Sequence, residues 1–130
     1  MKRLSELLEM PPAAFAAWAQ RLRDDAAARL LADWGWWRRD DQCPPAGDWH
    51  VWMLLAGRGF GKTRTGAEWV RCHAETHPGA RIALVAASLH EARQVMVEGE
   101  SGLLAIAPAQ TRPTYESSLR RLSWANGAVA

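Results

Sequence analysis

The 130-residue chain is poor in the features that mark secreted, zinc-binding and membrane-spanning proteins. Its two cysteines, Cys43 and Cys72, are too few and too far apart for a disulfide framework or a zinc site. His73 and His77 are four residues apart but lack the glutamate that a metalloprotease helix requires. No apolar run approaches the roughly 18 residues of a membrane span, and the basic start lacks a long apolar core. We therefore expect a cytoplasmic protein with no membrane partner.

An excess of charge of one sign is also missing. Lys and Arg number 16 and Asp and Glu 14, which gives a formal net charge of +2. The long-range electrostatic field is therefore only weakly basic, and it neither identifies nor excludes a nucleic-acid partner. Tryptophan, in contrast, is abundant with eight residues. Such a load is typical of a core, of a partner surface, or of both.

The most informative stretch is a glycine-rich turn between an apolar run and a helical pattern. Residues 51–56 are apolar and predict a strand, and the helical pattern after the turn ends near His77. The turn and its flank comprise Gly57, Arg58, Gly59, Phe60, Gly61, Lys62, Thr63 and Arg64. A strand, a glycine loop and a helix in this order place exposed N–H groups and the positive end of the helix dipole around phosphate groups.

Lys62 and Thr63 supply the other two functions that a phosphate loop needs. Lys62 adds a mobile positive charge near the β- and γ-phosphates, and the Thr63 hydroxyl can ligate Mg²⁺. The usual pattern has a glycine where this chain has Ala56, so Gly57 and Gly59 supply the flexibility instead. The pattern predicts a site for ATP and Mg²⁺, and the alternative is a glycine turn that binds no ligand.

The elements after this loop predict an α/β fold. Residues 81–86 form a near-continuous apolar run, typical of a strand buried on both faces. A strand, a crossover helix and a second strand imply a parallel, right-handed unit. Ser88 and Glu91 form a capping box for a helix over residues 89–98, residues after Gly99 predict a loop, and Asn126-Gly127 predicts a hairpin turn. We expect a P-loop NTPase of the RecA-like (ASCE) type, with a parallel sheet flanked by helices and incomplete in this chain.

Short helices are predicted ahead of this fold. They cover residues 2–9, 13–23 and 25–34, with Phe15, Trp18 and Leu22 on one stripe of the second and Gly35 ending the third. These helices either pack on the sheet or present a docking surface to a partner protein. The predicted organisation is a helical segment over 1–41 and the first part of an ATPase domain over 42–130.

Gln42 lies in the polar loop before the first predicted strand. A glutamine amide can bind adenine through the N6 and N7 edge of the base, because its donor and acceptor match that edge. An exposed loop glutamine without a ligand is the alternative.

A catalytic feature of P-loop ATPases has no counterpart in the sequence. No later strand ends in the Asp-Glu pair that would hold Mg²⁺ and activate the attacking water. We therefore expect the 130-residue chain to hydrolyse no ATP by itself. We also expect it to be marginally stable or self-associating, because two apolar strands would lack neighbours.

Several segments together resemble the N-terminal part of the ATPase domain of phage large terminases, including those of prophages and gene transfer agents. They are residues 42–49, 54–64, 66–70, 91–99, 118–122 and 126–128. The most specific feature is Arg58 inside a Walker A loop with a shortened glycine pattern. The resemblance implies that residues 57–64 bind nucleotide and that Gln42 lies in the adenine-binding segment. It also implies that Lys62 and Arg58 are catalytic, with Arg58 acting on the γ-phosphate in cis, and that Thr63 binds Mg²⁺.

This resemblance also implies a function. A large terminase is a motor protein, an ATP hydrolase that translocates double-stranded DNA into capsids. Its partners are the small terminase subunit and the portal protein, and it acts at the procapsid in the bacterial cytoplasm. The Walker B pair, the coupling motif and the nuclease domain of that family have no matching positions here. A helicase-like P-loop ATPase, a small-molecule kinase and a non-catalytic docking fragment that binds another packaging component are the alternatives.

Overall fold

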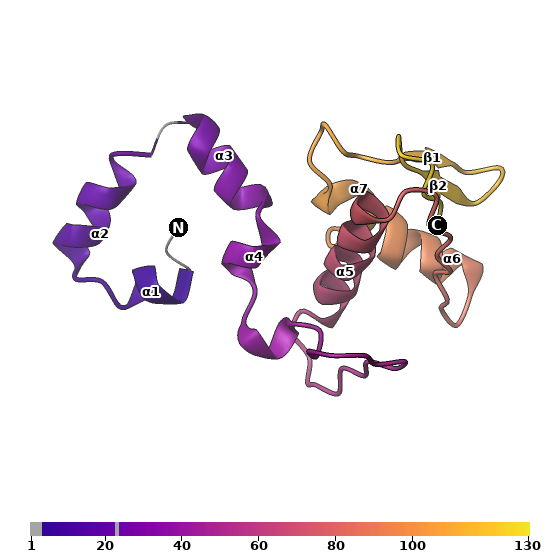
Figure 1. The fold of residues 1–130 in the computed structure, drawn as a ribbon, viewed down its shortest axis with the longest axis horizontal. Helices are drawn as coiled ribbons and strands as arrows, with labels where there is room; N and C mark the ends of the chain where they lie inside the picture. The colour runs from indigo at the N-terminus through magenta and orange to yellow at the C-terminus, as the bar shows by residue number, and fades with distance from the viewer. Residues whose placement is uncertain (1–3, 23) are drawn as a thin grey trace. The chain divides into compact units, whose positions relative to one another are not determined.

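The computed structural model describes residues 4–22 and 24–130, which form two compact units (Figure 1). The first unit is Met1–Gly47 and the second is Asp48–Ala130. The part of the chain that the structure describes holds no helix with the length and apolar character that crossing a bilayer requires.

The first unit is built of short helices, as predicted. They are α1 (Leu4–Leu8), α2 (Pro12–Ala19), α3 (Asp24–Ala32), α4 (Trp34–Trp37) and the 3-10 turn η1 (Asp40–Gln42). Pro12 occupies the first position of α2, where its missing N–H costs no hydrogen bond. Leu7 and Leu30 are buried, and the Trp37 Nε1–H donates a hydrogen bond to the Leu30 carbonyl at 2.9 Å. This bond ties α4 to α3.

One prediction for this unit is wrong. Gly35 does not end the third helix, because the chain leaves helical geometry at Asp33 and Gly35 then lies inside α4. The residues of the predicted apolar stripe are not fully covered: Phe15 is exposed, and Trp18 and Leu22, the latter beyond the end of α2, are half-buried. Helical spacing showed that these side chains share a side of the helix but not whether anything covers that side.

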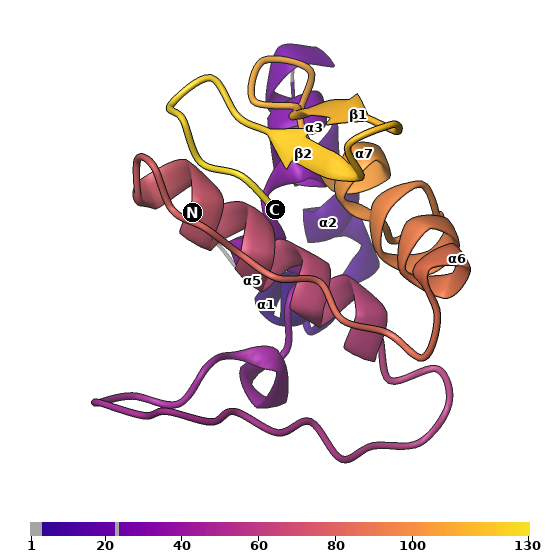
Figure 2. The ribbon, with the colours of Figure 1, turned by 90° about the vertical axis from the view of Figure 1, so that its right-hand side faces the viewer.

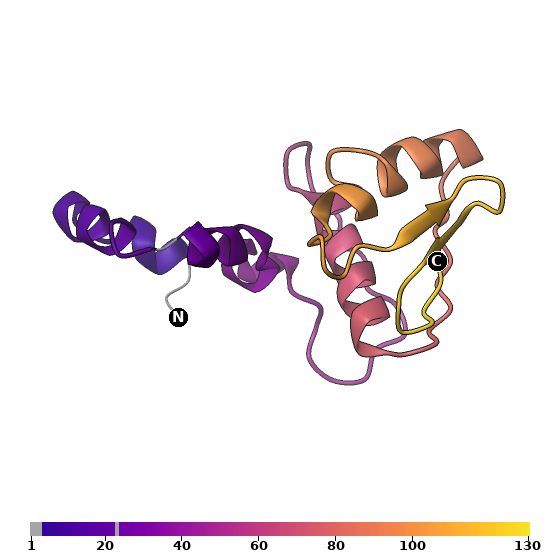
Figure 3. The ribbon, with the colours of Figure 1, turned by 90° about the horizontal axis from the view of Figure 1, so that it is seen from above.

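The second unit begins with an extended segment and the predicted glycine turn, and continues through one long helix. Its elements are α5 (Lys62–Thr76), α6 (Leu89–Glu91), the π-helical segment η2 (Ala92–Val97), α7 (Leu103–Ile106), β1 (Thr114–Glu116) and β2 (Arg121–Ser123). Figures 2 and 3 show α5 with α7 and the β1–β2 pair grouped around it.

The core of the second unit lies on the apolar face of α5. That face carries Ala67, Val70 and Ala74, all buried. Its partners come from η2, α7, the β2 region and the segment after the last turn: Val97, Leu103, Ile106, Leu122, Trp124 and Ala128. These three residues share one face because they follow the spacing i, i+3 and i+7, which brings side chains to the same side of a helix.

The predicted parallel sheet is not present among the described residues. The only sheet there is the antiparallel β1–β2 pair, in which Tyr115 lies opposite Leu122. Residues 51–56 are extended but belong to no ladder, and Val51 and Leu55 are 77% and 86% exposed. Residues 81–86 make a single parallel bridge, from Arg81 to Val129. A strand assignment requires a hydrogen-bonded neighbour, and these two segments lack one along most of their length.

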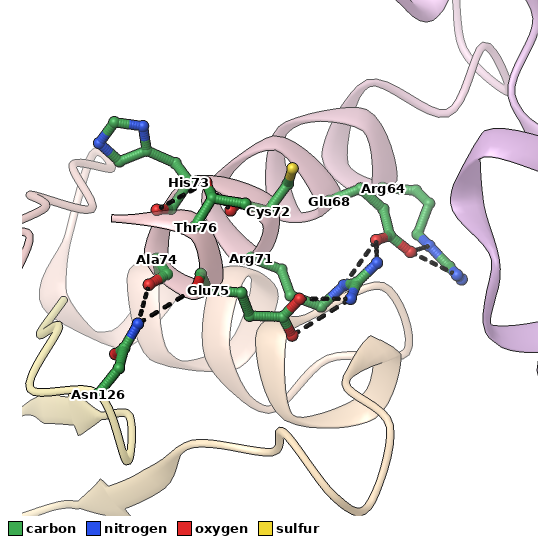
Figure 4. Close-up of polar contacts among 9 residues, drawn as sticks. All are labelled: Arg64, Glu68, Arg71, Cys72, His73, Ala74, Glu75, Thr76 and Asn126. Atoms are coloured by element: carbon green, nitrogen blue, oxygen red, sulfur yellow. Dashed lines mark hydrogen bonds and ion pairs between the residues drawn. The ribbon is translucent and has the colours of Figure 1, made fainter. Parts of the chain in front are cut away.

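The turn predicted at Asn126-Gly127 is present, but it is not the two-residue type: its loop runs over residues 125–127, and only Gly127 is left-handed, with a φ of 85°. The turn attaches the end of the chain to α5. After the turn, the Ala128 carbonyl accepts from the Trp124 N–H at 2.9 Å, so the chain runs back along β2. The Asn126 Nδ2 donates to the Ala74 carbonyl at 2.8 Å and to the Glu75 carbonyl at 3.3 Å (Figure 4). The Asn126 Oδ1 accepts from the Ala128 N–H at 3.1 Å. One side chain therefore satisfies carbonyls at the end of α5 and shapes the turn.

The helix predicted over residues 89–98 is present but changes its winding. It starts as predicted, with the Ser88 Oγ accepting from the Glu91 N–H at 3.1 Å. It then widens into η2, where the Glu98 N–H donates to the Arg93 carbonyl five residues earlier. The loop expected after Gly99 contains the short helix α7, whose Leu103 and Ile106 are buried.

Replacing Asn126 tests its attachment to α5. Asn126→Ala removes two bonds to helix carbonyls and is expected to lower the free energy of unfolding by roughly 1–3 kcal/mol, as measured by urea denaturation. Asn126→Asp is the matched variant, because it keeps the acceptor for Ala128 but puts negative charge beside the carbonyls of Ala74 and Glu75. It is expected to be as unstable as the alanine variant. An aspartate variant as stable as the original chain would contradict the role of the helix contacts.

The exposed apolar side chains of residues 51–56 predict self-association of the chain, because an extended segment with unpaired backbone groups and apolar side chains favours pairing with another copy. The double variant Val51→Thr, Leu55→Thr keeps strand propensity and removes the apolar surface, so it is expected to scatter less light at equal concentration. Leu8→Thr is the control, because Leu8 is 74% exposed but lies in the first unit. Equal scattering by the double variant and the original chain would contradict the prediction.

Candidate functional site

The glycine turn predicted from the sequence leads directly into α5. Gly59 and Gly61 have φ values of 79° and 91°, in the left-handed region where a side chain is strained. Gly57 does not need this conformation, and no heavy atom lies within 4 Å of the places where a Cβ on Gly57 or Gly59 would stand. The turn is therefore open on the side where these two glycines lie.

The amino end of α5 has the properties of an anion site. Gly61 is its N-cap and offers no side chain to cap the helix. The N–H groups of Lys62 and Thr63 make no backbone hydrogen bond within the described part of the chain. The Thr65 N–H and hydroxyl both donate to the Gly61 carbonyl, at 2.8 and 3.0 Å. Over the 15 residues of α5 the peptide dipoles add to a positive charge at this end.

Lys62 and Thr63 project from the same end of the helix. The Lys62 Nζ turns back over the loop and donates to the carbonyls of Ala56 and Gly57, both at 2.8 Å. Thr63 is exposed, and its hydroxyl makes no hydrogen bond with any described residue. The structure thus brings a cation, a hydroxyl and unpaired helix N–H groups to one place, and their role in binding a nucleotide stays a prediction.

The two arginines of the predicted site differ in their environment. Arg58 is exposed on the loop and makes no hydrogen bond or ion pair with a described residue. The guanidinium of Arg64 contacts Glu68 one turn further along α5, with Nε at 2.8 Å and a terminal nitrogen at 2.7 Å from Oε1. The charge of Arg64 is therefore compensated in this structure, and that of Arg58 is not.

Glu68 is a structural residue of α5 that the sequence analysis did not identify. Its side chain is fully buried, and its second oxygen accepts from Arg71, which also pairs with Glu75 (Figure 4). Burial lowers the pKa of Arg71, but attraction and hydrogen bonding by Glu68 and Glu75 outweigh it, so the pKa lies above its ordinary value. The spacing of Arg64, Glu68, Arg71 and Glu75 is the signal that predicts such a chain of ion pairs.

A cleft of 640 Å³ lies beside this site in the second unit. Its walls are mainly apolar and aromatic, from Trp49, Trp52, Leu54, Trp69 and Leu84, with Lys62 and Thr63 at the wall as well. Apolar walls cannot compensate phosphate charges, so the cleft is a poor place for a triphosphate. The groups that suit phosphate lie instead on the open loop and the amino end of α5.

Gln42 lies in the first unit, in η1. It is buried, and its side-chain Oε1 accepts a hydrogen bond from the Arg39 N–H at 3.0 Å. The burial of an amide side chain was not expected from its polar neighbours in the sequence. Its role in binding adenine stays a prediction.

No three His, Cys, Asp or Glu side chains within residues 4–22 and 24–130 gather as ligands for a metal ion. His73 and His77 stack on each other at 4.2 Å between ring centroids, and His73 stacks on Trp69 at 5.1 Å. These rings form a column along α5 and are packing contacts.

The family model described as terminase large subunit, T4likevirus-type, N-terminal, matches residues 53–130, which is more than half of the chain. Neither the curated proteins nor the solved structures contain a match to the chain. The matched region begins within the extended segment before the glycine turn and includes the loop, α5 and the whole core of the second unit. The chain therefore belongs to the T4likevirus-type terminase large subunit family and corresponds to its N-terminal region.

Proposed function

We propose that this chain is the ATP-binding part of a terminase large subunit, a motor that uses ATP hydrolysis to translocate double-stranded DNA into the capsid of a phage or phage-like particle. Membership of the terminase large subunit family supports a role in DNA packaging. The observation that carries the proposal for ATP is the position of Lys62, whose ammonium group stands over the glycine loop at the uncapped amino end of α5.

Each group of the loop has a defined task in this proposal. The N–H groups of Lys62 and Thr63 bind phosphate oxygens, and the Lys62 ammonium compensates the negative charge of the β- and γ-phosphates. The unpartnered Thr63 hydroxyl is the protein's ligand for Mg²⁺, which when bound neutralises phosphate charge and orients the triphosphate. A single hydroxyl suits Mg²⁺ in this chemistry, because the ion retains waters and takes its other ligands from the phosphates.

Arg58 is proposed to stabilise the γ-phosphate during hydrolysis. Its guanidinium is exposed and has no partner among the described residues, so it makes no hydrogen bond or ion pair that stabilises the loop. Arg64 has a different position in the proposal: its backbone belongs to the first turn of α5, while its side chain is held by Glu68. The proposed role of Arg64 in nucleotide binding is therefore carried by its backbone.

The family match favours a terminase over the other enzymes that a phosphate loop allows, namely a helicase-like ATPase and a small-molecule kinase. We include in the proposal the small terminase subunit and the portal protein as partners, and the procapsid in the host cytoplasm as the place of action. The helices of the first unit are candidates for one of these protein contacts, since Phe15 and Leu8 are exposed apolar residues there.

Lys62→Ala tests nucleotide binding by the chain itself. Loss of a charged donor to phosphate is expected to weaken binding of ATP with Mg²⁺ by roughly 1.5–3 kcal/mol, measured by titration calorimetry. Stability is expected to change little, because the two bonds that Lys62 makes in this structure are exposed. Arg81→Ala is the control, since it removes one exposed positive charge from the same unit but not from the loop. Equal binding by the Lys62→Ala variant and the original chain would refute the site.

Arg58→Ala separates catalysis from binding. In a terminase large subunit that contains this chain, the variant is expected to slow ATP hydrolysis by about 10³-fold, the low end for arginine fingers, while the affinity for ATP changes much less. Single-turnover phosphate release and equilibrium binding are the two measurements. A parallel fall of both quantities, or no change in either, would assign Arg58 to the loop structure instead.

A further inference from the structure

The loop that joins β1 to β2 contains an arginine in a backbone conformation that favours glycine. Arg120 has a φ of 52°, and it is the one non-glycine residue with positive φ in the described part of the chain. The loop is closed by the Leu119 N–H donating to the Glu116 carbonyl at 3.2 Å and by the Arg120 N–H donating to the Ser117 carbonyl at 3.3 Å. Glycine at position 120 would form the same turn without strain. Hairpin geometry therefore does not explain why this residue is an arginine.

The neighbouring arginines have acidic partners, and Arg120 does not. Arg121 pairs with Glu116 at 2.8 Å, and Arg93 pairs with Glu98 at 2.9 Å. Arg120 is exposed, and its guanidinium makes no hydrogen bond or ion pair with a described residue. Around this hairpin, the positive charge of Arg120 is thus left uncompensated by any acidic side chain.

Other hydrogen-bonding groups lie beside this charge. Ser117 and Ser118 are exposed, and neither hydroxyl has a partner in the described chain. A pocket of 330 Å³ opens next to the loop, and its polar lining comes from Ser117, Arg120, Arg93 and Tyr115. The guanidinium of Arg93 lies 5.9 Å from the centre of the Tyr115 ring, and this cation–π contact keeps Arg93 beside the pocket. The loop therefore presents an unpaired guanidinium and two free hydroxyls together.

We propose that residues 117–120 contact the phosphodiester backbone of double-stranded DNA, with Arg120 as the cation and the hydroxyls of Ser117 and Ser118 as additional donors. The planar guanidinium binds two phosphate oxygens at once, and serine hydroxyls are frequent donors to DNA phosphates. The strain at Arg120 is retained because glycine there would lose the charge. This proposal rests on the DNA-packaging role and names a surface for it that is separate from the ATP loop.

The test compares variants of the full 130-residue chain for binding to a labelled DNA duplex, by fluorescence anisotropy over a range of salt and without nucleotide. Arg120→Gly is expected to bind about tenfold more weakly at low salt, and to lower the slope of log affinity against log salt by about one, since one phosphate contact is lost. The same variant is expected to be at least as stable to urea as the original chain, because glycine relieves the backbone strain. Weakened binding is then not a result of unfolding.

Three further variants make the outcome decisive. Arg120→Lys keeps the charge and is expected to retain most of the binding. Arg81→Gln removes one exposed charge elsewhere in the same unit and is expected to bind like the original chain. Leu119→Ser tests whether the exposed leucine of the loop, which would suit a protein partner, is needed instead.

The proposal is overturned if the original chain does not bind the duplex, if Arg120→Gly binds like the original chain, or if Arg81→Gln weakens binding as much as Arg120→Gly. It is also overturned if Leu119→Ser alone abolishes binding. Because no nucleotide is present, a chain that failed to bind ATP would leave this result unaffected, so the two proposals fail separately.

Discussion

Burial of one narrow face of α5 is the constraint on which the second unit depends. Ala74 is completely inaccessible and Ala67 and Val70 nearly so, and the small size of the two alanines lets α7 and the turn after β2 approach the helix closely. Burying an aliphatic side chain stabilises a fold by roughly 1.5–3 kcal/mol, whereas an exposed ion pair contributes roughly 0–1 kcal/mol. The packed face therefore determines the position of α5, and the exposed pairs on other elements adjust to it. Because the helix is held along its length, its amino end and the loop attached to it are held as well.

Local features of this protein were predictable from the sequence. The turn glycines, the spacing of Lys62 from the apolar run, and the cap at Ser88 each depend on residues within a few positions of one another. Backbone sterics decide such features whatever the rest of the chain does, since a left-handed residue favours glycine and a helix N-terminus favours a serine cap. The loop, the start of α5 and the position of the turn at Asn126 were correct for this reason.

Features that need a distant partner were not predictable in the same way. An apolar run such as residues 51–56 predicts extended backbone, but only a neighbouring strand turns it into a sheet, and the described residues supply none there. The contact of Asn126 with Ala74 joins positions 52 residues apart. Glu68 has a spacing that predicts ion pairs with Arg64 and Arg71, yet nothing in the sequence indicates that its carboxylate is completely buried. The positive φ of Arg120 was likewise not predictable from the sequence, because a left-handed backbone conformation is normally indicated by a glycine.

The hydrogen bonds of Lys62 to loop carbonyls are the contacts that a ligand bound at the loop would replace. Its ammonium group donates to the carbonyls of Ala56 and Gly57 in an exposed setting, where water competes for both groups and keeps the net contribution of each bond small. A bond from the same ammonium to a phosphate oxygen joins two full charges, so the phosphate attracts the ammonium more strongly than a neutral carbonyl does. If the loop binds ATP as proposed, replacing a carbonyl by a phosphate is favourable for Lys62, and the carbonyls it leaves can bond to water. The loop bonds already hold the flexible lysine side chain over the glycine turn, so part of the entropy cost of ordering it for the proposed ligand is met in advance.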